Sequence, residues 1–273
     1  MKKIVCLILI LGLTVSFVFA KGKSDSVQTP NPKLICGVTE FEPMNYRDSS
    51  GKWIGFDSEF AEEVCKKLGM DVSFQEITWS QKFVELRSGA ISCIWNGMTA
   101  NTVDGTTGRP RNEDVDFSYS YMLNQQCAVI KADRSAEFTS VASLAGKKAA
   151  AEKGSAGEPI AIEAIGARGT MIDKTKQLDT FMEVLSGAVD LAVVDSILAH
   201  QLVGKGDYAG LKIANISLGS KMEVYAVGFP KGSDLVQKVN KVIKELYDDG
   251  TLYKIAHKYG LEESIVIGTE PIE

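Results

Sequence analysis

Two kinds of hydrophobic pattern alternate along the first half of the chain. Short apolar runs at residues 34–38, 72–77 and 91–95 are bounded by loop residues, which is typical of buried strands. Between them, apolar residues recur three and four positions apart over 57–68 and 81–88, as in amphipathic helices. Asp57 or Ser58 is the expected cap of the first of these helices, and Gly69 its end. The alternation predicts an α/β unit with a parallel sheet.

The same alternation returns over residues 126–220 and predicts a second α/β unit. Expected strands cover 127–130, 148–151, 189–194 and 212–214, and expected helices run to Ile165 and over 181–186 and 196–203. Asp179 or Thr180 is the expected cap of the helix at 181–186. After an extended stretch at 222–229, Ser233 is expected to cap a long amphipathic helix that Gly250 breaks. A last helix at 252–258 precedes a polar tail.

A helix that ends in Ser-Gly-Ala and continues directly into a buried strand occurs twice. Residues 84–97, VELRSGAISCIWNG, match residues 182–195, MEVLSGAVDLAVVD, so that Gly97 aligns with Asp195. Ligands of open α/β sheets bind at the carboxyl ends of the strands. Either two lobes repeat one plan and each presents such a strand end, or a common local pattern recurs by chance.

Candidate binding chemistry is concentrated between residues 91 and 121. The apolar run breaks at Asn96-Gly97, and a polar loop follows that carries Arg109 and Arg111. A guanidinium beside free backbone N–H groups can hold a carboxylate. Ser155 and Ala156 lie in a tight turn before a predicted helix, where unpaired N–H groups and a partial positive charge favour an anion.

Three further residues complete a candidate amino-acid site. Asp195 ends a buried strand directly before a helix, so its carboxylate either accepts hydrogen bonds from an ammonium or caps that helix. Phe41 and Trp79 lie in or beside loops, where they either enclose a ligand side chain or pack in the core. An Arg for a carboxylate, an Asp for an ammonium and two aromatic walls describe an α-amino acid.

Length, charge and motifs exclude several other classes. Residues 34–273 suit two domains of roughly 100–150 residues each. The formal charge of −5 comes without a basic stripe, which argues against nucleic acid. The sequence holds no zinc-type Cys/His spacing and no GxSxG, HExxH, GxGxxG or P-loop pattern. His200 and His257 lie on predicted helices as surface residues, and we expect neither a metal nor a cofactor.

The first twenty residues predict a secretory signal peptide. Lys2-Lys3 precedes an apolar core at residues 4–13, and Ala20 is a small residue suited to cleavage. A retained anchor is the alternative, and Cys6 lies near the start of the apolar core and not at its end, which does not fit a lipid-modified cysteine. Residues 21–33 read as a linker. Export permits disulfides, but the remaining cysteines lie in apolar stretches that favour buried thiols, namely Cys36, Cys65, Cys93 and Cys127.

Seven segments, in order and spanning nearly the whole predicted mature chain, resemble a known family. They are GVTEFEPMNY, GKWIGFDSEFAEEVCKKLG, ELRSGAISCIWNGMT, VDFSYSY, GAVDLAVVDS, YAVGFPKGS and LYDDGTLYKIAHKYG. The set is similar to the periplasmic solute-binding proteins of ABC transporters, specifically the polar-amino-acid-binding bacterial extracellular solute-binding family 3.

The resemblance implies an α/β fold of two lobes, the type II periplasmic-binding-protein fold. Lobe 1 would comprise residues 33–120 and 226–273, lobe 2 residues 126–220, and two hinge strands residues 121–125 and 221–225. The implied protein is an extracytoplasmic monomer and not an enzyme. It would close on a free amino acid, by a shift between open and closed populations, and dock on an ABC permease.

The resemblance also implies roles for eight residues. Phe41 and Trp79 would be aromatic walls, and Gly97 and Thr99 would hold the ammonium and the carboxylate. Arg111 would pair with the carboxylate, and Ser155 with the Ala156 backbone would cap it. Asp195 would take the ammonium.

Two departures from the family pattern leave questions open. An apparent insertion at residues 100–110 makes Arg109 a competitor of Arg111, which we prefer for its spacing to Asp116-Phe117-Ser118. Val38 stands where many members carry an acid. Glu40 and Glu152 lie near the expected pocket instead and could select a cationic side chain, although we expect both to be solvated.

Two rival functions use the same scaffold. The first is a cyclohexadienyl-dehydratase-like enzyme, in which Glu40 or Glu152 would act as the acid; a buried glutamate that holds its proton would favour it. The second is an amino-acid sensor without transport. We find no appended domain in this sequence that would support it.

Overall fold

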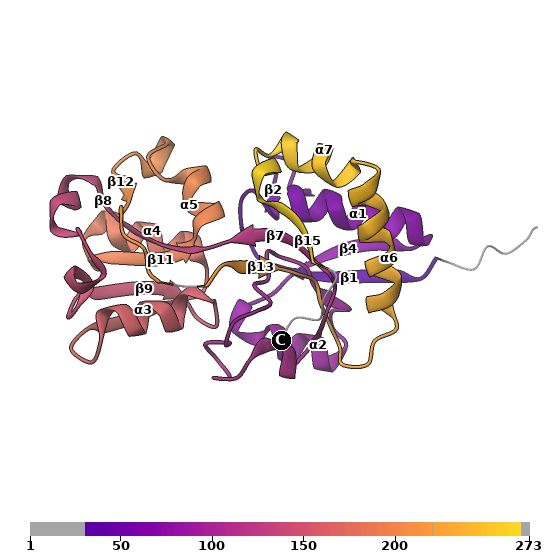
Figure 1. Ribbon diagram of the computed structural model, residues 1–273, viewed down its shortest axis with the longest axis horizontal. Helices are drawn as coiled ribbons and strands as arrows, with labels where there is room; N and C mark the ends of the chain where they lie inside the picture. The colour runs from indigo at the N-terminus through magenta and orange to yellow at the C-terminus, as the bar shows by residue number, and fades with distance from the viewer. Residues whose placement is uncertain (1–30, 220, 269–273) are drawn as a thin grey trace, which may run out of the picture. The chain divides into compact units, whose positions relative to one another are not determined.

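The computed structural model describes residues 31–219 and 221–268 (Figure 1). The predicted signal peptide and most of the predicted linker lie outside the described residues. The predicted alternation of strands and helices is confirmed, and it builds two five-stranded sheets, which we call the first and second lobe.

The first-lobe sheet has the order β4-β1-β5-β14-β6. β1 (Lys33–Val38) pairs in parallel with β4 (Asp71–Glu76) and with β5 (Cys93–Ile94). β14 (Gly228–Phe229) returns from the far end of the chain and runs antiparallel to both β5 and β6 (Asp116–Phe117). The strands predicted from the early part of the chain are parallel, as expected, and β14 makes the complete sheet mixed. The local sequence pattern does not show that such a late segment completes an early sheet.

Both faces of the first-lobe sheet are covered. Leu34, Cys36 and Val38 of β1 face a core shared with α1 (Phe56–Leu68), α6 (Leu235–Asp248) and α7 (Thr251–Lys258). Ile35 points to the other face, against α2 (Lys82–Ser88) and the 3₁₀ turn Trp79–Gln81. A strand buried on both faces is apolar throughout, which is why this one was predictable.

The second-lobe sheet has the order β10-β9-β11-β8-β12. β9 (Lys148–Glu152) is parallel to β10 (Thr170–Lys174) and β11 (Leu191–Asp195), whereas β8 (Gln126–Lys131) is antiparallel to β11 and to β12 (Leu211–Ile213). The two lobes thus share one order of strand directions. Of the two interpretations of the Ser-Gly-Ala match, the repeated plan is confirmed, with Gly97 and Asp195 at equivalent strand ends.

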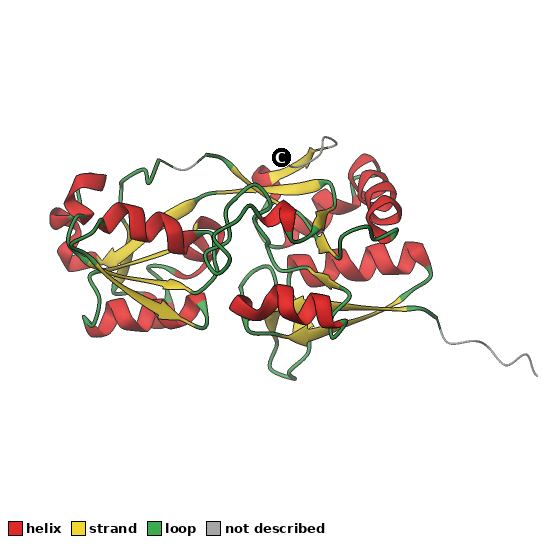
Figure 2. Ribbon diagram, turned by 90° about the horizontal axis from the view of Figure 1, so that it is seen from below, coloured by secondary structure: helices red, strands yellow, loops and turns green. Residues whose placement is uncertain are grey.

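Alternate residues of β11 separate the two cores of the second lobe. Ala192 and Val194 pack toward α4 (Gln177–Ser186) and α5 (Ser196–Leu202), and Leu191 and Val193 pack toward α3 (Gly157–Ile165). Figure 2 shows helices on both sides of this sheet. Burial of both faces stabilises the sheet by removing apolar surface from water.

A third, three-stranded sheet of order β13-β7-β15 lies between these sheets in the chain path. β7 (Ser120–Asn124) pairs antiparallel with β13 (Glu223–Tyr225), and β15 (Ile265–Gly268) joins the other edge of β7. β7 and β13 coincide with the predicted crossing segments, and their role as hinges stays a prediction. The predicted polar tail is corrected, because residues 265–268 form a strand.

Several expected caps are wrong. α1 begins one residue before Asp57 with Gly55 at its N-cap, and α4 begins at Gln177 after Lys176, ahead of Asp179 and Thr180. Asp234 stands at the N-cap position of α6, and the hydroxyl of Ser233, the predicted cap, accepts the Leu235 N–H at 3.3 Å. Gly69 and Gly250 do stand at helix ends in the left-handed conformation, as predicted. A short hairpin, β2 (Tyr46–Arg47) with β3 (Trp53–Ile54), was not predicted.

Candidate functional site

A small cavity brings together all eight residues of the predicted site. First-lobe loops and second-lobe strand and helix ends both contribute to its wall. Its lining comprises Thr39, Phe41, Trp79, Asn96, Gly97, Thr99, Arg111, Glu152, Ser155, Ala156, Gln177 and Asp195.

Arg111 is held rigidly at one end of this cavity and is only 1% exposed. Its Nη1 donates to the Thr99 carbonyl at 2.8 Å and its Nη2 to the Gly154 carbonyl at 2.9 Å. Its Nε donates to Asp104 Oδ2 at 3.3 Å. A guanidinium has five N–H donors, so it can still pair with a carboxylate. Arg109 instead pairs with Glu113 and Asp114 at the surface, so the structure places Arg111, not Arg109, in the cavity.

Asp104 and Lys82 form a buried ion pair behind this arginine. Lys82 Nζ lies 2.5 Å from Asp104 Oδ2, and both side chains are almost completely buried. The ammonium also lies 4.9 Å from the centre of the Trp79 ring. Burial, and next the charge of Arg111, lower the pKa of Lys82 to about 8, whereas Asp104 opposes this effect.

Gly97 is fixed by a buried aspartate that was predicted only as a helix cap. The Gly97 N–H donates to Asp57 Oδ2 at 2.6 Å, and the Tyr121 hydroxyl donates to the same oxygen at 3.0 Å. Burial raises the pKa of Asp57 to about 7. Gly97 has φ of +53°, and a Cβ there would lie 2.5 Å from Phe41 Cε1, so this position requires glycine.

The start of α3 faces the arginine from the second lobe. Ser155 Oγ accepts the Glu158 N–H at 3.2 Å, while the Glu158 carboxylate accepts the Gly154 N–H at 2.6 Å. This arrangement satisfies two N–H groups of the turn in the manner of a capping box. It also fixes Ser155 and Ala156 at the cavity wall.

Asp195 stands at the N-cap position of α5, but its side chain makes no capping hydrogen bond to the described residues of that helix. Its Oδ1 accepts from Asn124, Gln126 and the Tyr225 hydroxyl, and its Oδ2 accepts from Gln177 Nε2. α5 has no side-chain cap. Of the two interpretations of this residue, the cap is therefore wrong, and the carboxylate is directed into the cavity, where it is 5% exposed.

Each strand that connects the lobes donates a tyrosine hydroxyl to one cavity-supporting carboxylate. Tyr121 of β7 donates to Asp57 in the first lobe, and Tyr225 of β13 donates to Asp195 in the second at 2.8 Å. The connecting sheet therefore holds one acidic group on each side of the cavity.

A second buried carboxylate lies beside Asp195. Asn124 Nδ2 and Gln126 Nε2 each donate to both Asp195 Oδ1 and Glu223 Oε2. Thr99 Oγ1 also donates to Glu223, at 3.1 Å. Burial raises the pKa of Asp195, and burial with the charge of Asp195 raises that of Glu223 to about 7. Two adjacent buried acids would be stabilised by a nearby cation.

Glu152 is in the cavity wall and is 3% exposed, which overturns our expectation that it is solvated. Burial, and next the charge of Asp195, raise its pKa to about 8. Its Oε1 is buried without a hydrogen-bond partner among the described residues. Glu40 lies outside the cavity lining, with its Oε1 3.6 Å from Arg47 Nε, so for this residue the expectation was sound.

Phe41 and Trp79 line the cavity and are also part of the two first-lobe cores. They are 3% and 5% exposed, and the Phe41 ring meets the Tyr225 ring edge to face at 6.4 Å. The two alternatives for these aromatics are thus compatible, because each residue belongs to a core and also lines the cavity.

Sequence reasoning missed the residues that support the site from a distance in the chain. Gln177 lies ahead of the helix predicted at 181–186, and Lys82 and Glu223 lie within a predicted helix and a predicted extended stretch, so none was assigned a role. Charged residues inside otherwise apolar helical or strand faces are the signal that could have found Lys82 and Glu223.

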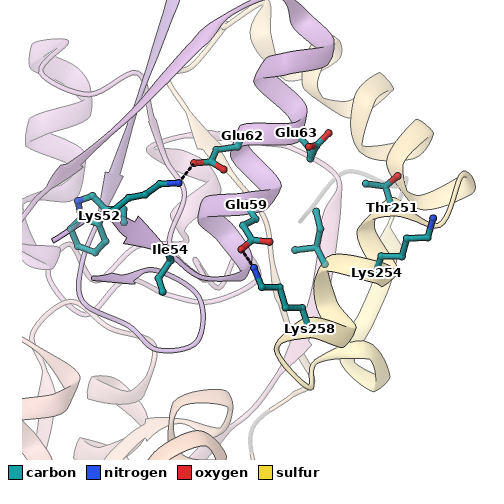
Figure 3. A pocket seen from close by; sticks show the side chains of 10 residues that line it. Lys52, Ile54, Glu59, Glu62, Glu63, Thr251, Lys254 and Lys258 are labelled. Atoms are coloured by element: carbon teal, nitrogen blue, oxygen red, sulfur yellow. Dashed lines mark hydrogen bonds and ion pairs between the residues drawn. The ribbon is translucent and has the colours of Figure 1, made fainter. Parts of the chain in front are cut away.

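A larger hollow on the surface of the first lobe holds none of the predicted residues (Figure 3). It lies between α1, α7 and β3, and several of its charges are already paired. Lys52 Nζ is 3.8 Å from Glu62, and Lys258 contacts Glu59. Paired and partly exposed charges stabilise little and define no ligand.

The described part of the chain offers neither a metal centre nor a membrane-spanning helix. No group of three or more His, Cys, Asp or Glu residues there could hold a metal ion. No helix within residues 31–219 and 221–268 has the length and apolar character needed to cross a membrane. His200 and His257 are exposed, as predicted, and the four described cysteines are buried free thiols.

The chain is similar to known proteins in both sequence and fold. The family model for bacterial extracellular solute-binding proteins, family 3, matches residues 34–262. The L-cystine-binding protein TcyA of Bacillus subtilis (strain 168) is 31% identical over 222 residues, which cover 80% of this chain and 77% of that protein. An ancestral arginine-binding protein, solved with bound arginine, is 30% identical with a TM-score of 0.74, covering 85% of this chain and 99% of that one.

A third similar structure belongs to the ancestral amino acid-binding protein AncCDT-1, described as a precursor of cyclohexadienyl dehydratase. It is 27% identical with a TM-score of 0.73, and the alignment covers 83% of this chain and 95% of that one.

Proposed function

This chain belongs to the bacterial extracellular solute-binding proteins, family 3, and we propose that it captures a free polar L-α-amino acid between its lobes and delivers it to an ABC permease. The observation that carries the ligand class is the pairing of opposite charges across one cavity. Arg111 from the first lobe and Asp195 from the second both line it, and both are buried. An α-amino acid carries the matching carboxylate and ammonium.

The carboxylate of the ligand pairs with Arg111. That guanidinium is oriented by three hydrogen bonds, so little side-chain freedom is lost when it binds an anion. Ser155 and the Ala156 backbone approach the same end of the cavity from the start of α3, where the helix dipole favours negative charge. Thr99 presents its backbone there as well.

The ammonium of the ligand lies at Asp195. Among the described residues, Oδ2 accepts one hydrogen bond, from Gln177, and a carboxylate oxygen can accept two. An ammonium there would also offset the charge that Asp195 and Glu223 bring into a buried space. The Gly97 carbonyl is the nearby first-lobe acceptor that we assign to the same ammonium.

Glu152 favours a ligand whose side chain is cationic or donates hydrogen bonds. Its buried Oε1 has no partner among the described residues, and a buried polar atom left unpaired destabilises the protein. A ligand donor at this oxygen removes that cost. Phe41 and Trp79 enclose the aliphatic part of such a side chain.

Calorimetric titration of the refolded, ligand-free protein with the twenty amino acids tests this function. We expect one clear binder or a small group of binders among arginine, lysine, histidine, glutamine and cystine, the last added to the panel. No heat of binding for any member would overturn the proposed function.

The buried, protonated Glu152 also supports a second candidate, an enzyme that aromatises a cyclohexadienyl amino acid. Glu152 would give its proton to the ring hydroxyl, which leaves as water, while the ring carboxylate leaves as CO2 and its bonding electrons complete the aromatic ring. A carboxyl group with a pKa of about 8 holds its proton at neutral pH and can act as a general acid. Ultraviolet absorbance of the aromatic product tests this activity. Product formation that Glu152→Gln abolishes would establish it, whereas absence of product leaves the binding function.

A further inference from the structure

The loop at residues 100–110, which has no role in the proposed ligand contacts apart from positioning Arg111, carries its own buried charge. Asp104 accepts the backbone N–H groups of Thr106 at 3.0 Å and Thr107 at 3.2 Å. Its other oxygen meets Lys82 and Arg111. The loop therefore closes on its own aspartate, which gives two buried cations a common counter-charge.

Both of these cations reach across to the second lobe. Lys82 Nζ donates to the Gly154 carbonyl at 3.0 Å, and Arg111 Nη2 donates to the same oxygen at 2.9 Å. Gly154 lies in the turn between β9 and α3. Hydrogen bonds from charged donors are the stronger kind, and here two of them converge on one acceptor.

The loop itself is packed tightly against the same turn. A Cβ at Gly154 would lie 2.5 Å from Thr106 Oγ1, and a Cβ at Gly105 would collide with the Glu158 carboxylate. Glu158 is the residue whose carboxylate holds the Gly154 N–H. The loop thus approaches the start of α3 more closely than any residue with a side chain at position 105 would allow.

From these contacts we propose that residues 104–106 and Lys82 form a latch that holds the start of α3 against the first lobe and so prolongs the closed state. Lys82 and Asp104 are positioning residues, because they act on the ligand only through Arg111 and Gly154. The consequence for binding rests on the proposed function, but the latch itself consists of protein groups alone.

Two variants remove the latch in different ways. Lys82→Met keeps the length of the side chain and deletes its charge, while Asp104 retains Arg111 as a partner. Gly105→Ala leaves every charge in place and adds only the methyl group that meets Glu158. Circular dichroism and thermal unfolding establish that each variant is folded.

Lys176→Met is the matched control. Lys176 is also a lysine that bridges the lobes, at 2.8 Å from Glu76, but both side chains are more than a third exposed. An exposed pair contributes little because water and salt screen it. We therefore expect this variant to behave like the wild type.

Pulsed dipolar spectroscopy measures closure without any ligand. Spin labels at Lys66→Cys on α1 and Met182→Cys on α4 report the distance between lobes, and the natural cysteines are buried away from the label. We expect a short-distance population in the wild type that both latch variants reduce and Lys176→Met retains. Wild type without that population, or latch variants indistinguishable from it, would overturn the latch.

Stopped-flow tryptophan fluorescence with L-arginine as the probe measures the effect on binding. We expect about tenfold faster dissociation for Lys82→Met and Gly105→Ala with little change in association, because charge-assisted contacts made only on closure govern release. An unchanged dissociation rate would contradict the latch. If L-arginine does not bind, the amino acid that calorimetry identifies replaces it as the probe. If no member of the panel binds, the proposed function is wrong, and the label distances still decide the latch.

Discussion

Gln177 and Asp195 hold each other by two reciprocal hydrogen bonds. Gln177 Nε2 donates to Asp195 Oδ2 at 2.5 Å, and the Asp195 backbone N–H donates to Gln177 Oε1 at 3.0 Å. One amide therefore fixes both the main chain and the carboxylate at the end of β11. The acid that we assign to the ligand ammonium is oriented before any ligand arrives.

Replacement of Gln177 by leucine is expected to weaken ligand affinity about tenfold, since it leaves an acceptor and a donor of Asp195 unpaired. Calorimetry with the best ligand of the panel measures the change. Gln201→Leu is the control, because Gln201 also bridges the lobes but only through a 3.4 Å contact to Glu42. Equal affinities for both variants would remove Gln177 from the site.

Replacement of Arg111 by lysine is expected to lower affinity at least about a hundredfold, because an ammonium cannot pair with a carboxylate in the bidentate manner of a guanidinium. Arg109→Lys should leave affinity unchanged, since Arg109 is exposed and pairs with Glu113 and Asp114. The two titrations, run side by side, decide between these arginines. A larger loss for Arg109→Lys would reverse our assignment.

The pH dependence of binding should depend on the charge of the ligand side chain. Glu152 has a pKa of about 8 in the free protein, so below that pH it is protonated and must release its proton to pair with a cation. Affinity for a cationic amino acid should therefore rise as the pH increases from about 6 toward 8. Glu152→Gln should remove the rise, and a slope that the variant keeps would assign it to another group.

Asp57 should make stability depend on pH in the direction opposite to an ordinary salt-bridged acid. Its pKa is raised from 3.8 to about 7, so its contribution to folding is present below its unfolded pKa and is lost as the pH rises through about 7. Asp57→Asn is neutral throughout, so the variant should gain stability relative to the wild type between about pH 5 and 8, on the order of 2–4 kcal/mol. Urea unfolding at several pH values measures it, and a constant difference would contradict the raised pKa.

The sequence predicted those parts of the fold whose residues show their burial locally. β1 and β11 are apolar in their interiors because both faces are covered, and α6 shows a clear apolar stripe. β10 and β15 were missed because their residues are only partly buried and carry no such pattern. β14 was recognised as extended, but its pairing with β5 depends on contacts more than a hundred residues apart.

Some residues of the candidate site could likewise be predicted from the local sequence, whereas others depend on contacts far apart in the chain. Arg111, Asp195 and the turn at Ser155 were visible because each follows a strand or precedes a helix, where side chains and backbone groups become available. Asp57 resembled a helix cap, and nothing near it in the sequence indicates that it accepts the N–H of Gly97, forty positions away. Lys82 likewise depends on Asp104, a partner that only the folded loop supplies.

The return of β14 into the first sheet has a consequence for the order in which the chain can fold. The sheet of the second lobe is complete once residue 213 has been synthesised, since all five of its strands lie between residues 126 and 213. The first lobe needs β14, α6 and α7, which come last from the ribosome. Its early strands must therefore wait with their apolar faces uncovered until almost the whole chain is made, and the cavity that both lobes share is the last part to form.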